Sequence, residues 1–405
     1  MKKTMCELFA GVGGFRLGFD RLKSGWETVW FSQFEPGSKT QHAYNCYVEH
    51  FGNSTDKNGE ITTGKDISTV NKEAIPEHSL LTAGFPCQDY SIARSKVTAM
   101  GIEGKKGVLW WQIYETLIAK NTPFCLFENV DRLVKSPAKQ RGRDFGIMLT
   151  CLNNLGYAVE WRIVNAASYG AAQRRKRTYI FAYKDTTKYN KKLSKKSLPD
   201  IVEKEGFFAN IFKISEVVNS GTATLPKDIT KTSEKFSFNF ENAGVMRDGK
   251  IYTAKIKEDA TKPILLGSIL ENDVDEKYYI TAEKMKKWVY LKGGKKIPRK
   301  AANGHEYMYS EGPVPFPDEW DKPARTLLTS EGVVSRTSHA VKDPKTERLR
   351  ILTPKETERL QGFDDDWTDT GMTERMRYFC MGNALVVPMV TMMGKEIDKI
   401  IEKEK

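Results

Sequence analysis

The sequence predicts an α/β fold, in which a parallel, doubly wound sheet with helices on both faces is joined to a second, smaller domain. Two observations support this prediction. Before Lys184, short apolar runs alternate with segments of helical periodicity, as expected for strand-helix-strand units. Near Lys184 the alternation stops, and a polar, lysine-rich stretch leads into a region of irregular pattern.

The elements of the expected sheet follow one another along the chain. Strands are predicted for the apolar runs at 5–10, 28–35, 79–85, 124–130, 158–166 and 177–184. Helices are predicted where a glycine turn or apolar residues at helical spacing separate these runs, at 11–23, 39–51, 110–118 and 145–152. This order predicts parallel strands connected by helices.

The second domain is expected between residues 187 and 345, where short β-like runs mix with turn glycines and prolines. Helical order returns at Thr353, which should cap a helix that has Pro354 in its first position. The last helix begins after Asn383 and carries an apolar stripe. We therefore expect one domain of residues 1–186 plus 346–405, and a second of residues 187–345.

Composition narrows the class of protein. Of 405 residues, 40% are hydrophobic and 29% charged, which is typical of a globular protein. The apolar runs are too short for a transmembrane helix, and Glu7 interrupts any signal-peptide core, so an intracellular location is expected. The six cysteines and five histidines show no metal-ligand or disulfide spacing, and no metal is expected.

The net charge of +12 favours a polyanionic partner, most simply nucleic acid. A lysine-rich proteome would explain the same charge, and composition does not separate the two.

A glycine-rich turn follows the first predicted strand, in the stretch ELFAGVGGFRLGF. Such a turn lets a ligand approach the backbone at the carboxyl end of a strand. A dinucleotide site would need a G-x-G-x-x-G pattern, and Arg16 occupies the place of its last glycine. With Glu35 for a ribose, Asp66 for an adenine amino group and Phe9 as an apolar wall, the turn better suits adenosine.

Cys87 lies where the third predicted strand gives way to a polar loop, in LLTAGFPCQDYSIARS. Most lone cysteines are packed in a core, but this one follows Pro86 and precedes polar residues. The loop should therefore lie at the edge of the sheet where open α/β folds bind ligands. A partly ionised thiol there would be a strong nucleophile.

Two further segments carry charged groups at strand ends. Glu128 ends the hydrophobic run FCLFE and should have a raised pKa, as a proton donor would, although a structural carboxylate is the plainer interpretation. In QRRKR, residues Gln173, Arg175 and Arg177 alternate, which would place them on one side of a strand. They form either a recognition face or a solvated basic edge.

Together these segments resemble the cytosine-C5 DNA methyltransferase family of bacteria and phages. The resemblance follows the family's motif order through these segments: ELFAGVGGF, Glu35 with HAYNCY, GKDIS, GFPCQDYS, KKGVLWW, FENV, QRRKR, RLRILTPKETERLQGF and MGNALVVPMV. It implies a Rossmann-like, S-adenosylmethionine-dependent catalytic domain, with residues 187–345 as the target recognition domain.

The resemblance also implies roles for individual residues. The reaction would use Cys87 as nucleophile, Glu128 at cytosine N3, Arg177 at O2 and Arg175 in support. The residues implied in S-adenosylmethionine binding are Phe9, Gly11, Gly13, Gly14, Glu35, Pro36, Asp66, Ile67, Pro86, Leu109 and Asn383. Those implied in DNA binding are Gln88, Ser91, Arg94 and Gln173.

Four positions depart from the family pattern, and none removes a catalytic residue. Tyr90 and Arg94 alter the segment after the Pro-Cys pair, Lys106 replaces an arginine, and Ala172 replaces a proline. The implied partner is double-stranded DNA, acted on by a monomeric enzyme of the bacterial cytoplasm and nucleoid, alongside a possible cognate restriction endonuclease. The target sequence and the base that removes the C5 proton are not specified.

Three alternatives differ in what the chain would act on. A transfer-RNA cytosine methyltransferase of the same family would keep the chemistry, although the long middle domain favours DNA. A non-catalytic nucleic-acid-binding module would not need Cys87, Glu128 and Arg177. A nicotinamide-dependent dehydrogenase would need the missing glycine.

Overall fold

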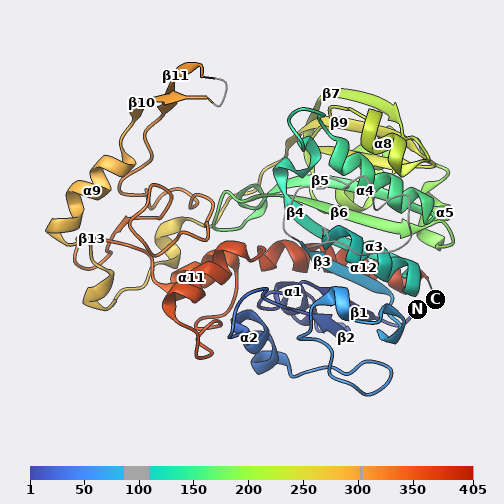
Figure 1. Cartoon of the computed structure of the whole chain (residues 1–405), viewed down its shortest axis with the longest axis horizontal. Helices are drawn as coiled ribbons and strands as arrows, with labels where there is room; N and C mark the ends of the chain where they lie inside the picture. The colour runs from blue at the N-terminus through green and yellow to red at the C-terminus, as the bar shows by residue number, and fades with distance from the viewer. Residues whose placement is uncertain (86–108, 302–303, 405) are drawn as a thin grey trace. The chain divides into compact units, whose positions relative to one another are not determined.

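The structure is a computed structural model that describes residues 1–85, 109–301 and 304–404 (Figure 1). It divides into two compact units. Unit 1 comprises Met1–Tyr169, Lys176–Lys262 and Leu385–Lys405. Unit 2 comprises Gly170–Arg175 and Pro263–Ala384.

Unit 1 is built on a nine-stranded sheet in the order β2-β1-β3-β4-β6-β5-β8-β9-β7 (Figure 1). Strands β2, β1, β3 and β4 run parallel, and every later pairing is antiparallel. The strands are β1 Thr4–Leu8, β2 Glu27–Ser32, β3 Leu80–Gly84, β4 Phe124–Val130, β5 Tyr157–Asn165, β6 Lys176–Lys184, β7 Ile214–Thr224, β8 Ala243–Arg247 and β9 Lys250–Glu258.

Helices cover both faces of this sheet. Alternate residues of a strand point to opposite faces, so Cys6 and Leu8 join a core cluster with Trp110 and Phe145 of α3 and α4, whereas Glu7 points to the other face, where it meets Tyr47 of α2. The helices of unit 1 are α1 Gly14–Asp20, α2 His42–Phe51, α3 Leu109–Lys120, α4 Arg143–Asn154, α5 Lys188–Leu193, α6 Leu198–Asp200, α7 Phe207–Ile211, α8 Ile229–Lys235 and α12 Val387–Lys403.

The last helix, α12, returns to pack on α1. The backbones approach closely at Gly18, where an added Cβ would lie 2.5 Å from Val390 Cγ1. The hydroxyl of Thr391 donates a hydrogen bond to the Gly18 carbonyl at 3.0 Å. The apolar stripe predicted for this helix is buried, including Val390, Met393 and Ile397. The C-terminal helix therefore supports the helix that follows the glycine turn.

The described residues of unit 2 form two small antiparallel sheets and three α-helices. The sheets are β10 Lys295–Lys300 with β11 Glu306–Glu311, and β12 Val341–Lys342 with β13 Leu349–Arg350. The helices are α9 Ala282–Lys292, α10 Pro354–Gln361 and α11 Glu374–Asn383. The predicted start of α10 is confirmed: Thr353 accepts a hydrogen bond from the Glu356 amide, and Pro354 is the first helical residue.

The predicted fold class is confirmed, with two differences. Strand β6, which was expected to be parallel to the others, pairs antiparallel with β4 and β5, and the sheet extends further than predicted. Strands β7, β8 and β9 come from the region predicted to be irregular, yet they extend the main sheet beyond β5. Sequence periodicity shows that a segment is extended, but not which strand edge accepts its hydrogen bonds.

The boundaries of the two compact units differ from those of the two expected domains. Residues 187–262 lie in unit 1, and residues 346–384 lie in unit 2. Compactness does not test which residues recognise DNA, so the division into catalytic and target recognition domains stays a prediction.

Among the described residues, no helix is long and apolar enough to cross a membrane. In the same part of the chain, no group of three or more His, Cys, Asp or Glu side chains is arranged to hold a metal ion.

Candidate active site

The turn between β1 and α1 has the backbone conformation that its glycines predict. Gly11 and Gly13 adopt positive φ of 58° and 89°, and Phe9, which is not a glycine, adopts φ of 56°. Such a conformation costs a non-glycine residue free energy and is often found at ligand sites. An added Cβ at Gly11 would meet nothing within 4 Å, whereas one at Gly13 would lie 2.4 Å from Phe51. Gly11 thus borders open space, and Gly13 permits close packing on α2.

The segment after β2 is tied to this turn. The amide of Gly11 donates to Gln33 Oε1 at 2.7 Å, and the amide of Gln33 donates to the Thr63 carbonyl at 3.0 Å. These bonds bring the ends of β1 and β2 and the loop before Asp66 together at one edge of the sheet. Gln33 was not predicted as a site residue, since a single glutamine after a strand carries no distinctive pattern.

The carboxylate of Glu35 is held at the start of α2. Its Oε2 accepts a hydrogen bond from the Ala43 amide at 2.9 Å. Burial raises the pKa of Glu35, although that amide and nearby His42 act in the opposite direction. Pro36, next in the chain, is exposed.

Asp66 caps a short helical turn at the same edge. Its Oδ1 accepts hydrogen bonds from the Ser68 amide at 3.0 Å and the Ser68 hydroxyl at 2.8 Å. The side chain is exposed, whereas Ile67 is 4% exposed. The loop therefore presents one exposed carboxylate beside a buried apolar residue.

Glu128 and Arg177 form an ion pair on neighbouring strands. Arg177 Nε lies 2.8 Å from Glu128 Oε1, and both side chains are largely buried. The pairing follows from the sheet, because β4 and β6 are antiparallel and Arg177 lies opposite Val130, two residues beyond Glu128. A carboxylate and a guanidinium thus face each other where β4 ends and β6 begins.

The end of β3 lies beside this ion pair. Gly84 is the strand partner of Glu128, and an added Cβ at Gly84 would lie 3.7 Å from Glu128 Oε2. The buried amide of Asn129 donates a hydrogen bond to the Phe85 carbonyl at 2.8 Å. Asn129 therefore fixes the path of the chain as it leaves β3. Its position in FENV was noted in the sequence, but this contact was not predicted.

Gln173 and Arg175 do not lie on the strand that carries Arg177. Strand β6 begins only at Lys176, so the expected alternation does not extend to these two residues, both of which belong to unit 2. Arg175 is 1% exposed and donates to the carbonyls of Leu327 at 2.8 Å and Ala384 at 2.7 Å.

Gln173 is fully buried. Its amide nitrogen donates to the Leu360 carbonyl at 2.9 Å, and its oxygen accepts from the Leu327 amide at 3.1 Å. A contact with DNA would require it to leave these partners, and its predicted role stays a prediction.

The remaining predicted residues lie in three places. Gly14 begins α1 and Leu109 begins α3, both in unit 1. Asn383 ends α11 in unit 2 and is exposed. The other predicted residues lie outside the described part of the chain: Pro86, Cys87, Gln88, Ser91 and Arg94.

A family model described as C-5 cytosine-specific DNA methylase matches residues 3–399. The chain belongs to this family. Membership makes it a DNA cytosine-5-methyltransferase, and it favours DNA over transfer RNA as the substrate. S-adenosylmethionine use follows from the family and the fold.

Relatives agree with this assignment. The chain is 46% identical to a Type II methyltransferase, M.Sau3AI of Staphylococcus aureus, over 98% of this chain and 96% of the relative. It is 27% identical to the Type II methyltransferase M.DsaV of Dactylococcopsis salina, over 98% and 86% of the two chains.

Among solved structures, the crystal structure of S. pombe Dnmt2 methyltransferase superposes with a TM-score of 0.59 at 16% identity, and it covers 99% of both chains. The Spodoptera frugiperda DNMT2 structure gives 0.60 at 15% identity, with 99% of this chain and 100% of that chain covered. At these identities the likeness concerns the fold alone.

Proposed function

We propose that this methyltransferase transfers a methyl group to carbon 5 of a cytosine that is flipped out of duplex DNA, in a sequence-specific manner and through a covalent adduct with Cys87. The observation that carries the proposal is the Glu128–Arg177 ion pair beside the end of β3, three residues before Cys87. Flipping the base costs a few kcal/mol of lost stacking and pairing, which contacts with the protein offset.

Glu128 and Arg177 suit neighbouring atoms of the cytosine ring. The Glu128 carboxyl donates a hydrogen bond and then a proton to N3, and the Arg177 guanidinium donates to O2. The Cys87 thiolate forms a bond to C6 while N3 takes up the proton, so negative charge does not accumulate on the ring. After methylation, C5 loses its proton to a base, the sulfur–carbon bond breaks, and N3 returns its proton.

The residues at the ends of β1 and β2 fit S-adenosylmethionine. Gly11 borders open space, because an added Cβ there would meet no atom within 4 Å. Glu35 and Asp66 supply carboxylates at the same edge of the sheet. When bound, S-adenosylmethionine supplies the methyl group as an electrophile. We assign the adenosine part to Phe9, Gly11, Gly13, Gly14, Glu35, Pro36, Asp66 and Ile67, and further contacts to Pro86, Leu109 and Asn383.

We assign the DNA contacts near the flipped base to Gln88, Ser91, Arg94 and Gln173, and a positioning role to Arg175. By analogy with its Type II relatives, the enzyme would belong to a restriction-modification system, with a cognate endonuclease. We expect it to act as a monomer in the bacterial cytoplasm.

Bisulfite sequencing of DNA from cells that express the chain tests the function. Unconverted cytosines within one short sequence are expected for the wild type and absent for Cys87→Ser. Purified Cys87→Ser should still bind S-adenosylmethionine. Full methylation by this variant would contradict the nucleophile assignment, and methylation of transfer RNA in place of duplex DNA would contradict the substrate.

A further inference from the structure

Several cations of the middle region could reach DNA, and the structure separates them into two groups. Arg247 in unit 1 is used internally, because its guanidinium donates to the carbonyls of Leu193 at 2.7 Å and Lys196 at 3.2 Å. In unit 2, Arg325 and Arg336 are also held by internal contacts, whereas the cations of strand β10 project from a ribbon.

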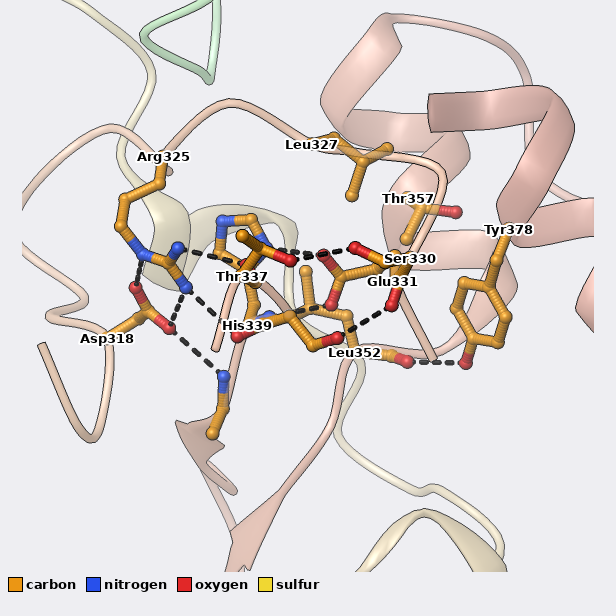
Figure 2. A network of polar contacts seen from close by, with 12 residues as sticks. Asp318, Arg325, Leu327, Ser330, Glu331, Thr337, His339, Leu352, Thr357 and Tyr378 are labelled. Carbon is orange, nitrogen blue, oxygen red and sulfur yellow. Dashed lines mark hydrogen bonds and ion pairs between the residues drawn. The ribbon is translucent and has the colours of Figure 1, made fainter. Parts of the chain in front are cut away.

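Arg325 belongs to a polar network in unit 2 (Figure 2). Its Nε and Nη2 donate to the two oxygens of Asp318 at 2.6 and 3.1 Å, and Nη1 donates to the Thr337 carbonyl at 3.0 Å. In the same network, Glu331 accepts from the amide and ring of buried His339 at 2.7 and 2.9 Å. Arg325 is therefore a structural residue, and the network holds the segment that carries Arg336.

Arg336 clamps the base of the β10–β11 ribbon. Its guanidinium donates to the carbonyls of Leu291 at 2.8 Å and Gly293 at 3.1 Å, just before β10, and also to the carbonyl of Gly312, just after β11. Lys292, buried beside them, donates to the Ser338 carbonyl. Both ends of the ribbon are thus fixed to the polar network.

The ribbon itself is a separate two-stranded sheet that extends from the rest of unit 2 (Figure 1). One of its faces is held by side-chain contacts: Arg299 stacks 3.8 Å above the Tyr309 ring within the ribbon, and Lys295 lies 4.1 Å from the ring of Tyr290 on α9. On this face Ile297 and Tyr309 are half-buried.

The opposite face of the ribbon is exposed along its whole length. It carries Lys296 and Lys300 at its ends, with the pair Pro298 and Met308 between them. Met308 is 59% exposed. Lys300 has an acidic cross-strand partner in Glu306 at 3.8 Å, whereas Lys296 lies opposite Ser310. An apolar side chain between two lysines suits a groove that has phosphates on both sides.

We propose that the β10–β11 ribbon enters the major groove of the DNA substrate with this exposed face toward the bases. The inference rests on the proposed function, since it assumes duplex DNA as the substrate. Two strands about 4.8 Å apart, with side chains, fit a major groove about 12 Å wide but not a minor groove about 6 Å wide. Lys296 and Lys300 contact phosphates on either side of the groove, and Met308 contacts base edges, where a thymine methyl is the apolar partner.

The test measures DNA binding by the full chain as a function of salt concentration. The double variant Lys296→Ala with Lys300→Ala should lower the slope of log affinity against log salt by about two, because two phosphate contacts are lost. The charge-conserving pair Lys296→Arg with Lys300→Arg should retain the slope. Met308→Ala should weaken binding to the target duplex about tenfold and leave the slope unchanged.

The control removes two exposed lysines elsewhere, Lys191→Ala with Lys192→Ala on α5, and changes the net charge by the same amount. It should bind DNA with the slope of the wild type. An equal loss of slope in the control and the ribbon variant would overturn the proposal, and so would an unchanged slope in the ribbon variant.

Chemical footprinting distinguishes the two grooves. Dimethyl sulfate modifies guanine N7 in the major groove and adenine N3 in the minor groove. The wild type should protect guanine N7 within its site, and the ribbon double variant should lose that protection. Loss of protection at adenine N3 in its place would overturn the assignment to the major groove. Failure of the wild type to methylate or bind duplex DNA would instead overturn the proposed function.

Discussion

At the scale of single residues, the candidate site depends on one anionic and one cationic side chain from adjacent strands. Glu128 is 8% exposed, and its carboxylate lies 2.8 Å from the Arg177 guanidinium. Since a buried charge without a partner is costly, each group stabilises the other while the substrate is absent. In the proposed mechanism, the same two groups contact N3 and O2 of the bound cytosine.

Replacement of Glu128 by glutamine should slow methyl transfer by roughly 10²- to 10⁴-fold, because an amide donates a hydrogen bond but transfers no proton. Single-turnover incorporation of tritiated methyl groups measures this rate. The matched control is Glu27→Gln at the exposed start of β2, the opposite end of the strand from the site. A change of less than about threefold in Glu128→Gln would count against the assignment.

At the scale of elements, the β1–α1 turn contains two glycines that have different structural roles. Gly13 faces the rings of Phe51 and Tyr47 on α2, where an added Cβ would lie 2.4 and 3.2 Å away, whereas Gly11 faces open space. Both have positive φ, but only Gly13 is also required for packing. The turn therefore packs against α2 on one side and leaves room for a ligand on the other.

Two alanine variants test this division. Gly13→Ala should lower the free energy of unfolding by about 1–3 kcal/mol through overpacking and backbone strain. Gly11→Ala should cost about 1 kcal/mol, from the backbone alone, and should weaken S-adenosylmethionine binding through the added methyl group. Chemical denaturation and calorimetric titration measure the two effects. Gly11→Ala with unchanged cofactor affinity would exclude Gly11 from the cofactor site.

At the scale of the whole molecule, the stability of unit 1 is linked to pH through a carboxyl inside the sheet. Glu7 is fully buried on β1, where it accepts a hydrogen bond from the Tyr47 hydroxyl at 3.1 Å. Burial raises the pKa of Glu7 to about 8, and the hydrogen bond from Tyr47 and the charge of Arg16 offset only part of this effect. The folded protein therefore favours the protonated form of Glu7.

Because the folded-state pKa lies above the unfolded one, the stability that protonated Glu7 contributes is complete below about pH 4.5. It is lost as the pH rises toward 8. Between pH 6 and pH 8.5, the stability of Glu7→Gln relative to the wild type should therefore rise by about 2 kcal/mol. Burial also raises the pKa of Glu160, to about 7. Glu160 titrates in the same way in both proteins, so its effect cancels when the variant is compared with the wild type. A difference that does not change with pH would contradict this linkage.

Much of the fold could be predicted because its signals are local. The strand of FCLFENV, the cap at Thr353 and the stripe on α12 each depend on residues close in sequence. Hydrogen-bond partners within a turn and side-chain periodicity suffice to specify them. The arrangement of residues 187–345 was harder to predict, because the sequence of an extended segment such as β7 or β9 does not indicate which strand will lie beside it.

The sequence by itself determined the family, the fold class and the residue types that the chemistry requires, since these are written in ordered motifs and in local periodicity. The tertiary structure decided which of these groups meet. It paired Glu128 with Arg177, placed Asn129 against the Phe85 carbonyl, and buried Arg175 against backbone carbonyls of unit 2. It also enclosed Arg325 within unit 2 and left Lys296 on an exposed ribbon. The physical reason is that strand neighbours and burial depend on contacts between segments distant in sequence, which no local pattern specifies.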